Sequence, residues 1–160
     1  MIYDIFASPM GDILVTSDGE KIITFGFVGQ KHLKPISDSW EKELNHNLLQ
    51  KAKKQTEEYF LGKRKTFDLP LSPQGTEFQR KVWLALEQIP FGQVTTYGKI
   101  AKKINNPKGV RAVGGAIGRN PIGIIIPCHR VVGTNKTLTG YAGGLDRKQN
   151  LLELEGVLLH

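Results

Sequence analysis

Cysteine, acidic charge and long apolar runs are all scarce in this sequence. Its single cysteine, Cys128, excludes a disulfide within the chain, and the N-terminus lacks a basic-then-apolar leader, so a reducing, cytoplasmic setting is expected. Apolar runs extend over only a few residues, too short to cross a membrane, and no membrane partner is expected. One cysteine and four scattered histidines offer no spacing typical of a metal site, so neither a metal nor another cofactor is expected.

The acidic residues are distributed unevenly. Residues 1–71 hold ten basic and ten acidic side chains, which cancel, whereas residues 72–160 hold twelve basic and five acidic ones and carry the whole net charge of +7. The 58 positions from 88 to 145 contain eight lysines and arginines and no acidic residue. Basic charge confined to one half indicates a polyanionic partner, with nucleic acid ahead of an anionic membrane surface. A merely basic surface is the simpler alternative.

The beginning of the chain has the pattern of a small antiparallel sheet. Residues 2–8 alternate between apolar and polar side chains, and residues 12–16 continue in an extended pattern. Asp18-Gly19 is a hairpin turn signal, after which residues 21–28 are expected to form the next strand.

A helix is expected to follow the sheet, from about residue 40 to 60, with Ser39 as its N-cap and Gly62 as its stop. No motif in this half carries chemistry, so residues 1–70 are expected to form a supporting domain. The polar, proline-punctuated stretch after Gly62 indicates a boundary, which leaves residues 71–160 as a second domain.

The second half is expected to be mostly helical. Thr76 is an N-cap signal before an amphipathic helix that ends at Pro90. Thr96 is expected to begin a short helix through about residue 104, and a further helix is expected over residues 108–118. Two short helices around a tight break have the outline of a helix-turn-helix. A last helix is expected to end at Gly156. The predicted fold class is therefore mixed α/β of the α+β type, with a small antiparallel sheet and one helix in the first half and mostly helices in the second.

The helix expected at residues 108–118 is unusual, because it contains the adjacent pair Gly114 and Gly115. Each glycine in a helix interior costs about 1 kcal/mol relative to alanine. A slim helix bearing Arg111 suits entry into a narrow groove, and it equally suits close packing against another helix of the protein. Spacing alone leaves both interpretations open.

Cys128 lies between Pro127 and His129 and has apolar residues on both sides. Residues 122–126 lead into it and are expected to be a buried strand or extended segment. A lone cysteine in such surroundings is most often a small buried hydrophobe, and reactivity would need a lowered pKa from a basic group or a held imidazole. Neighbouring side chains on a strand point to opposite faces, so the pair meets only if the backbone turns, which Pro127 favours.

Several motifs then occur together in one order and at consistent spacing between about residues 76 and 156. They are Pro127-Cys128-His129-Arg130-Val131, residues 92–97, residues 111–116, Asn120-Pro121, residues 141–145 and Glu155-Gly156. This set strongly resembles the O6-alkylguanine–DNA alkyltransferases, also called methylated-DNA–protein-cysteine methyltransferases. The first half is compatible with the N-terminal domain of that family, which resembles a ribonuclease H-like sheet.

The resemblance implies direct DNA repair. Cys128 would accept an alkyl group from O6 of guanine in a single irreversible turnover, and O4 of thymine is left open as a further substrate. His129, acting through a water and held by Glu155, would remove the thiol proton. Tyr97 would hydrogen-bond the base at N3 and assist the leaving guanine.

The implied partner is double-stranded DNA containing O6-alkylguanine, which a monomer would bind with the damaged base flipped out. Arg111 would be a finger that fills the gap in the base stack, on a helix presented to the minor groove. The other DNA-binding residues implied are Tyr97, Ala112, Gly114, Gly115 and Arg119. The implied base pocket comprises Val131, Tyr141, Ala142 and Gly143.

The resemblance also implies a structural role for Asn120 and a departure from the family pattern at Ala142. Asn120 would buttress the turn between the recognition helix and the active-site segment. Many members of the family carry serine where this chain has Ala142. Alanine keeps the backbone amide that contacts guanine O6, so activity is expected to survive the loss of the hydroxyl.

Three other functions compete with repair. A non-catalytic sensor of alkylated DNA would replace the acceptor cysteine, usually with tryptophan, and Cys128 argues against it. A helix-turn-helix regulator of transcription would need neither the Cys-His pair nor a Gly-Gly helix, and a cysteine hydrolase would leave the basic region unexplained.

Overall fold

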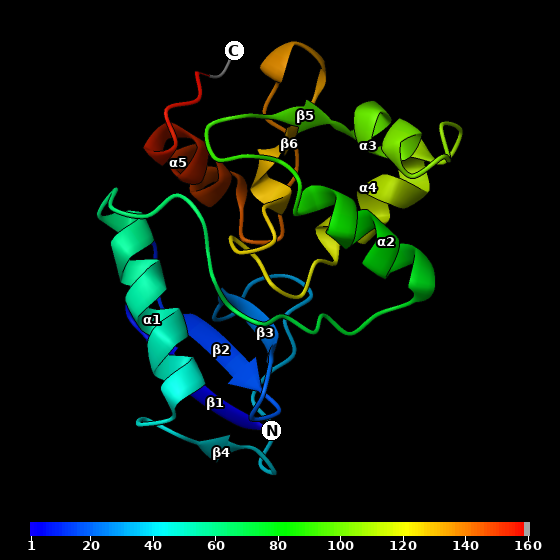
Figure 1. Cartoon of the computed structure of the whole chain (residues 1–160). Coiled ribbons are helices and arrows are strands. Elements are labelled where there is room, and N and C mark those ends of the chain that lie inside the picture. The colour runs from blue at the N-terminus through cyan, green and yellow to red at the C-terminus, as the bar shows by residue number, and fades with distance from the viewer. Residues whose placement is uncertain (159–160) are drawn as a thin grey trace.

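The first half of the chain forms a sheet with one helix, and the second half is mostly helical, as predicted for an α+β protein (Figure 1). This computed structural model describes residues 1–158. None of the helices in that part of the chain is both long and apolar enough to span a membrane.

The sheet has the strand order β3-β2-β1-β4. Its strands are β1 (Ile2–Phe6), β2 (Ile13–Ser17), β3 (Ile22–Phe27) and β4 (Glu41–Lys42). The first three pair antiparallel and confirm the predicted meander, whereas β4 pairs parallel with β1 and was not predicted. Every residue of β2 is buried, because it lies between two other strands and α1 packs on the sheet.

The helix of the first half, α1 (Asn47–Phe60), is shorter than predicted. It begins at residue 47 instead of 40, and its N-cap is His46, whose ring accepts a hydrogen bond from the Leu48 amide, instead of Ser39. Residues 41 and 42 are extended instead, because the amides of Glu41 and Glu43 donate to the carbonyls of residues 1 and 3. Pairing with a distant strand has overridden the local helical pattern.

The second half contains four α-helices among the described residues. They are α2 (Glu77–Leu86), α3 (Tyr97–Lys103), α4 (Val110–Gly118) and α5 (Leu145–Leu154). Thr76 and Thr96 cap α2 and α3 as predicted, and at Thr76 the side chain of Gln79 completes a capping box. The helix α4 begins two residues later than predicted. The predicted helix-turn-helix is thus α3 and α4.

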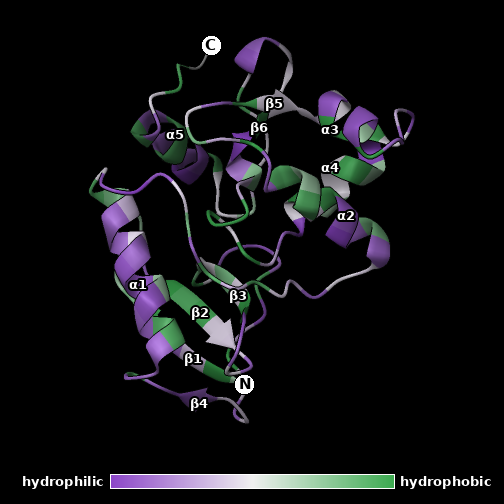
Figure 2. Cartoon of the chain, viewed as in Figure 1, coloured by the Kyte–Doolittle hydropathy of each residue, from purple (hydrophilic) through white to green (hydrophobic). Residues whose placement is uncertain are grey.

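The helix α4 is mostly apolar or small in sequence, and it mixes hydrophobic and hydrophilic residues along its length (Figure 2). Val113, Ala116 and Ile117 are buried on its inner face. The indole Nε1–H of Trp83 in α2 donates to the carbonyl of Ala116 over 2.8 Å, in the buried interior. This bond and the apolar contacts fix the orientation of α4.

The two halves are joined along the outer edge of β3. The amide of Ser72 donates to the carbonyl of Ile22, and the amide of Phe25 donates to the carbonyl of Pro121, at 2.8 and 2.9 Å. A single apolar core includes residues of both halves, among them Phe25 and Leu151. The sheet is therefore held directly against the segment that leads into Cys128.

Residues 122–126 are buried, as predicted, apart from the partly buried Ile125, but they turn and do not form a strand. The amide of Ile126 donates to the carbonyl of Ile122 over 3.0 Å, and Ile124 has a φ of 65°. A 3-10 helix, η1 (Cys128–Arg130), follows directly. It continues into β6 (Val131–Val132), which pairs parallel with β5 (Thr95–Thr96), and a second 3-10 turn, η2 (Thr134–Lys136), comes next.

Candidate active site

Cys128 is the first residue of η1 and is only 7% exposed. It lines a cavity of about 330 Å³. Four other residues predicted from the sequence line the same cavity, namely Tyr97, Gly114, Tyr141 and Ala142. The nucleophile candidate, the tyrosine and part of the predicted base pocket are therefore brought together around one space.

The backbone does leave strand geometry at Pro127, whose φ and ψ are −81° and 64°. Asn120 holds the turn that precedes it. The side-chain oxygen of Asn120 accepts from the Ile122 amide at 3.0 Å, and its nitrogen donates to the Ile126 carbonyl at 2.8 Å. One buried side chain thus bridges both ends of the turn, and this supports the buttressing role expected of it.

The thiol of Cys128 is not activated in the resting protein. Burial raises its pKa above the ordinary value, and this outweighs the opposing effects of Asn120 and of the positive charge on Lys148. A buried thiol at neutral pH therefore keeps its proton, so nucleophilic chemistry at Cys128 requires a base.

His129 is a fully buried neighbour whose ring nitrogen Nε2 lies 2.7 Å from Oε2 of Glu155. Burial lowers the pKa of His129, although Glu155 acts in the opposite direction. The imidazole is therefore neutral at neutral pH, which is the form that can accept a proton.

Glu155 follows the last turn of α5, and its buried carboxylate takes part in five hydrogen bonds. Besides His129, its partners are both Nε and Nη2 of Arg130, the amide of Gly92 and the hydroxyl of Tyr59, at 2.6–3.2 Å. Burial opposes ionisation of the carboxyl, but the hydrogen bonds from His129 and Arg130 and the positive charge of Arg130 overcome it and lower the pKa of Glu155 to about 2. Glu155 is a fixed negative charge.

An ionised carboxylate has no proton to give, so Nε2 of His129 must be the donor in their hydrogen bond. A neutral imidazole carries one proton, and Nδ1 is therefore left with a lone pair. Within residues 1–158, Nδ1 is buried and has no hydrogen-bond partner. The arrangement thus presents one unengaged basic nitrogen on the residue next to Cys128.

A second hydrogen-bonded chain reaches Tyr97. The hydroxyls of Tyr97 and Thr139 lie 2.8 Å apart, and the ammonium of Lys148 donates to the Thr139 hydroxyl at 3.1 Å. Lys148 is buried, and this burial lowers its pKa to about 8.

The outer face of α4 carries the other predicted DNA-binding residues. Arg111, Ala112 and Gly115 are exposed on α4, and Arg119 is exposed just after it. A Cβ on Gly114 would meet Tyr97 at an ordinary 3.7 Å, and a Cβ on Gly115 would have no described atom within 4 Å. Packing within the protein does not require these glycines, so the structure favours their role in approaching a partner.

The structure does not bring all the predicted residues to the cavity. Val131 and Gly143 are buried but are not among its lining residues, and His129 and Glu155 likewise lie outside its lining. Arg111, Ala112, Gly115 and Arg119 belong to the surface of α4 instead.

Several residues of the site could not be found from the sequence. Lys31 and His32 of the first half line the cavity, and Tyr59 of α1 binds Glu155. Nothing local distinguishes these three residues from other surface or core positions. Arg130 lies inside the Cys-His motif, so its part in holding Glu155 was the one role that the pattern could have suggested.

Comparisons with known proteins agree along the whole chain. The family model described as the DNA binding domain of 6-O-methylguanine DNA methyltransferase matches residues 77–157, and that described as its ribonuclease-like domain matches residues 1–73. The chain is 53% identical to the methylated-DNA–protein-cysteine methyltransferase of Methanosarcina acetivorans, over 98% of this chain and 99% of that protein. The Haemophilus influenzae protein of the same name is 46% identical, over 98% and 87%.

A solved structure gives the same picture. The crystal structure of Mycobacterium tuberculosis OGT in complex with DNA superposes with a TM-score of 0.89 and 40% identity, and it covers 97% of this chain and 92% of that one. An O6-methylguanine DNA methyltransferase of Methanococcus jannaschii superposes with a TM-score of 0.68 and 32% identity, over 98% and 95%.

Acid should lower the free energy of unfolding of the protein, because Glu155 becomes protonated. A carboxyl whose folded pKa lies near 2 instead of 4.5 stabilises the fold above pH 4.5, and this contribution is lost as the pH falls toward 2. We expect Glu155→Gln to lower the free energy of unfolding at neutral pH by on the order of 3 kcal/mol. Denaturant unfolding at a series of pH values should show this gap closing in acid.

The matched control is Glu153→Gln, which removes an exposed carboxylate from α5 two residues away. It should change the free energy of unfolding little at any pH. A gap between Glu155→Gln and wild type that stays constant from neutral pH to acid would contradict the assigned ionisation of Glu155.

Proposed function

The chain belongs to the 6-O-methylguanine DNA methyltransferase family, and we propose that Cys128 is the residue to which it transfers the alkyl group. Its activity is the repair of DNA by transfer of an alkyl group to a protein cysteine. The observation that carries the assignment is that Cys128 is the only cysteine of the sequence. The sequence offers no other acceptor for the reaction.

The proton of the thiol goes to His129. The lone pair on Nδ1 is the acceptor, reached through a water, and the imidazolium that forms is stabilised by the negative charge of Glu155 against Nε2. The resulting Cys128 thiolate attacks the alkyl carbon on O6 of guanine. The carbon–sulfur bond forms as the carbon–oxygen bond breaks, and the thioether is permanent, so each chain acts once.

The departing guanine carries the electrons of the broken bond and needs a proton. Tyr97 lines the cavity and its hydroxyl already takes part in a hydrogen bond with Thr139, so it is placed to donate to N3 of the base. Tyr141, Ala142 and the backbone around them form the rest of the pocket for one base. Val131 and Gly143 do not line the cavity, and we propose that Val131 serves the bound base through its backbone carbonyl, which accepts from the exocyclic amine.

The DNA partner follows from the surface of α4. A base inside a duplex cannot reach a buried thiol, so the O6-alkylguanine must be flipped out of the helix. Exposed Arg111 fills the gap that it leaves, and exposed Ala112, Gly115 and Arg119 lie against the minor groove, with the surrounding basic residues on phosphates. We propose that a monomer does this in the cytoplasm, where a reducing environment keeps the thiol intact.

The two halves divide this work. Residues 71–160 bind DNA and accept the alkyl group, and residues 1–70 support them. Cys128 in a cavity favours repair over a silent sensor of alkylated DNA, and the Gly-Gly helix beside that cavity favours it over a regulator of transcription.

The alkyl acceptor can be identified directly. A duplex carrying O6-methylguanine with a labelled methyl group should lose the label to the protein, at one methyl per chain, on the peptide that contains Cys128. Cys128→Ser should acquire none. Peptide mass mapping makes the measurement, and a wild-type protein that remains unlabelled at Cys128 would refute the proposed function.

The proposed role of Arg111 predicts a different effect of its substitution on two substrates, duplex DNA and the free base. Arg111→Ala should slow methyl transfer from the duplex at least about tenfold, because the gap in the stack is no longer filled, and should leave reaction with free O6-methylguanine nearly unchanged. Lys54→Ala on the exposed face of α1 removes the same charge far from α4 and serves as the control. Equal slowing of both substrates by Arg111→Ala would exclude the finger role.

A further inference from the structure

We infer that Tyr59, which belongs to the supporting half of the chain, is a positioning residue of the proton-transfer pair and sets how strongly Glu155 holds the proton of His129. The inference deepens the proposed function, because it rests on His129 acting as the base. It assigns to α1 a part in the chemistry of the site, because the other hydrogen-bond partners of Glu155 all lie in the second half.

The contact is short and shares an atom with the catalytic pair. The hydroxyl of Tyr59 donates to Oε2 of Glu155 over 2.6 Å, and Nε2 of His129 binds the same oxygen at 2.7 Å. Tyr59 and Glu155 are 96 positions apart in the sequence. Both side chains are buried, at 1% and 5% exposure, so water does not compete for this oxygen.

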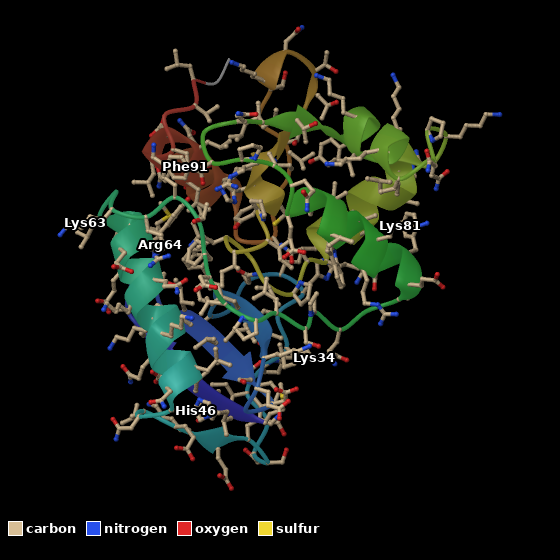
Figure 3. All side chains as sticks on the ribbon, viewed as in Figure 1. Lys34, His46, Lys63, Arg64, Lys81 and Phe91 are labelled. Carbon is tan, nitrogen blue, oxygen red and sulfur yellow. The ribbon has the colours of Figure 1, made fainter. Side chains whose placement is uncertain are left out.

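The ring of Tyr59 is held in place by other aromatic rings. Phe67 lies 5.6 Å from it, centroid to centroid, and Phe91 meets it edge-on at 6.2 Å. The guanidinium of Arg130 lies over the same Phe91 ring, which Figure 3 labels near the end of α1. Phe91 therefore contacts both side chains, the Tyr59 phenol and the Arg130 guanidinium, that bind Glu155. Rotation of the Tyr59 side chain away from Glu155 would disturb its packing against Phe67 and Phe91.

Tyr59 acts only as a donor. Burial and the adjacent charge of Glu155 raise the pKa of its hydroxyl far above the ordinary value, so it stays protonated at every working pH. The other charged or titratable groups that act on the pair are Arg130 of η1, Lys148 of α5 and Tyr141. Tyr59 is the one supplied by the first half.

Two donors on one carboxylate oxygen weaken each other. The Tyr59 hydroxyl draws electron density from Oε2, so Glu155 stabilises the His129 imidazolium less than it would alone. In the opposite sense, the same hydroxyl fixes the rotation of the carboxylate so that Oε2 faces His129. Loss of the hydroxyl should therefore make His129 a stronger base and loosen its orientation.

The test is the acid limb of the pH profile for single-turnover methyl transfer. The rate should fall as the pH drops through the pKa of His129, which burial holds below 6.5, because protonated His129 cannot accept the thiol proton. Tyr59→Phe should move this limb to higher pH, with about a three- to tenfold tighter binding of the proton by His129. Tyr3→Phe in β1, whose ring packs on Trp40, is the matched control and should leave the limb in place.

Replacement of Tyr59 by 3,5-difluorotyrosine guards against a variant that fails to fold. Fluorination keeps the hydroxyl and makes it a stronger donor, so the acid limb should move the opposite way, to lower pH. Opposite shifts for the two variants would support the inference. A limb unchanged in both, with only a lower melting temperature in Tyr59→Phe, would overturn it and leave Tyr59 a structural residue.

A second readout separates this inference from the proposed function. Titration of the His129 ring by NMR in the same variants reports its proton affinity without any substrate. If wild type transfers no methyl group but the His129 titration shifts as described, the proposed function fails and the link to Tyr59 stands. If wild type transfers the methyl group but the Tyr59 variants shift neither the acid limb nor the His129 titration, the proposed function stands and the inference about Tyr59 fails.

Discussion

The buried carboxylate of Glu155 is the group at which hydrogen bonds from both halves of the chain meet. It collects hydrogen bonds from α1, from the loop after α2 and from η1, while it is itself fixed at the end of α5. A buried charge with so many donors is tolerated only when all of them are in place, because an unsatisfied buried carboxylate is costly. Folding of both halves is therefore coupled to the assembly of one ionised group.

Under the proposed function, this arrangement accounts for a buried thiol that is unreactive at rest and reacts once the substrate is bound. Burial keeps the proton on Cys128, and the same burial keeps His129 neutral. Glu155 fixes which nitrogen of the imidazole carries the proton, and so leaves the other nitrogen free to act. The cavity beside Cys128 then decides which molecules can reach it.

The sequence predicts those parts of the molecule that depend on local pattern. The strands of the meander, the threonine caps of α2 and α3 and the glycines of α4 all have a local physical reason and occur where expected. The start of α1 was misplaced because β4 pairs with β1, and residues 122–126 turn because Asn120 spans them. Tyr59 could not be found at all, since its partner lies 96 positions away and no pattern links them.

The protonation of the His129 ring tests this account most directly. Nitrogen chemical shifts of the imidazole, measured on the wild-type protein at neutral pH and assigned with a His129→Asn variant, report which nitrogen carries a proton. We expect a neutral ring with the proton on Nε2 and a lone pair on Nδ1. A ring protonated on Nδ1, or on both nitrogens at neutral pH, would contradict it.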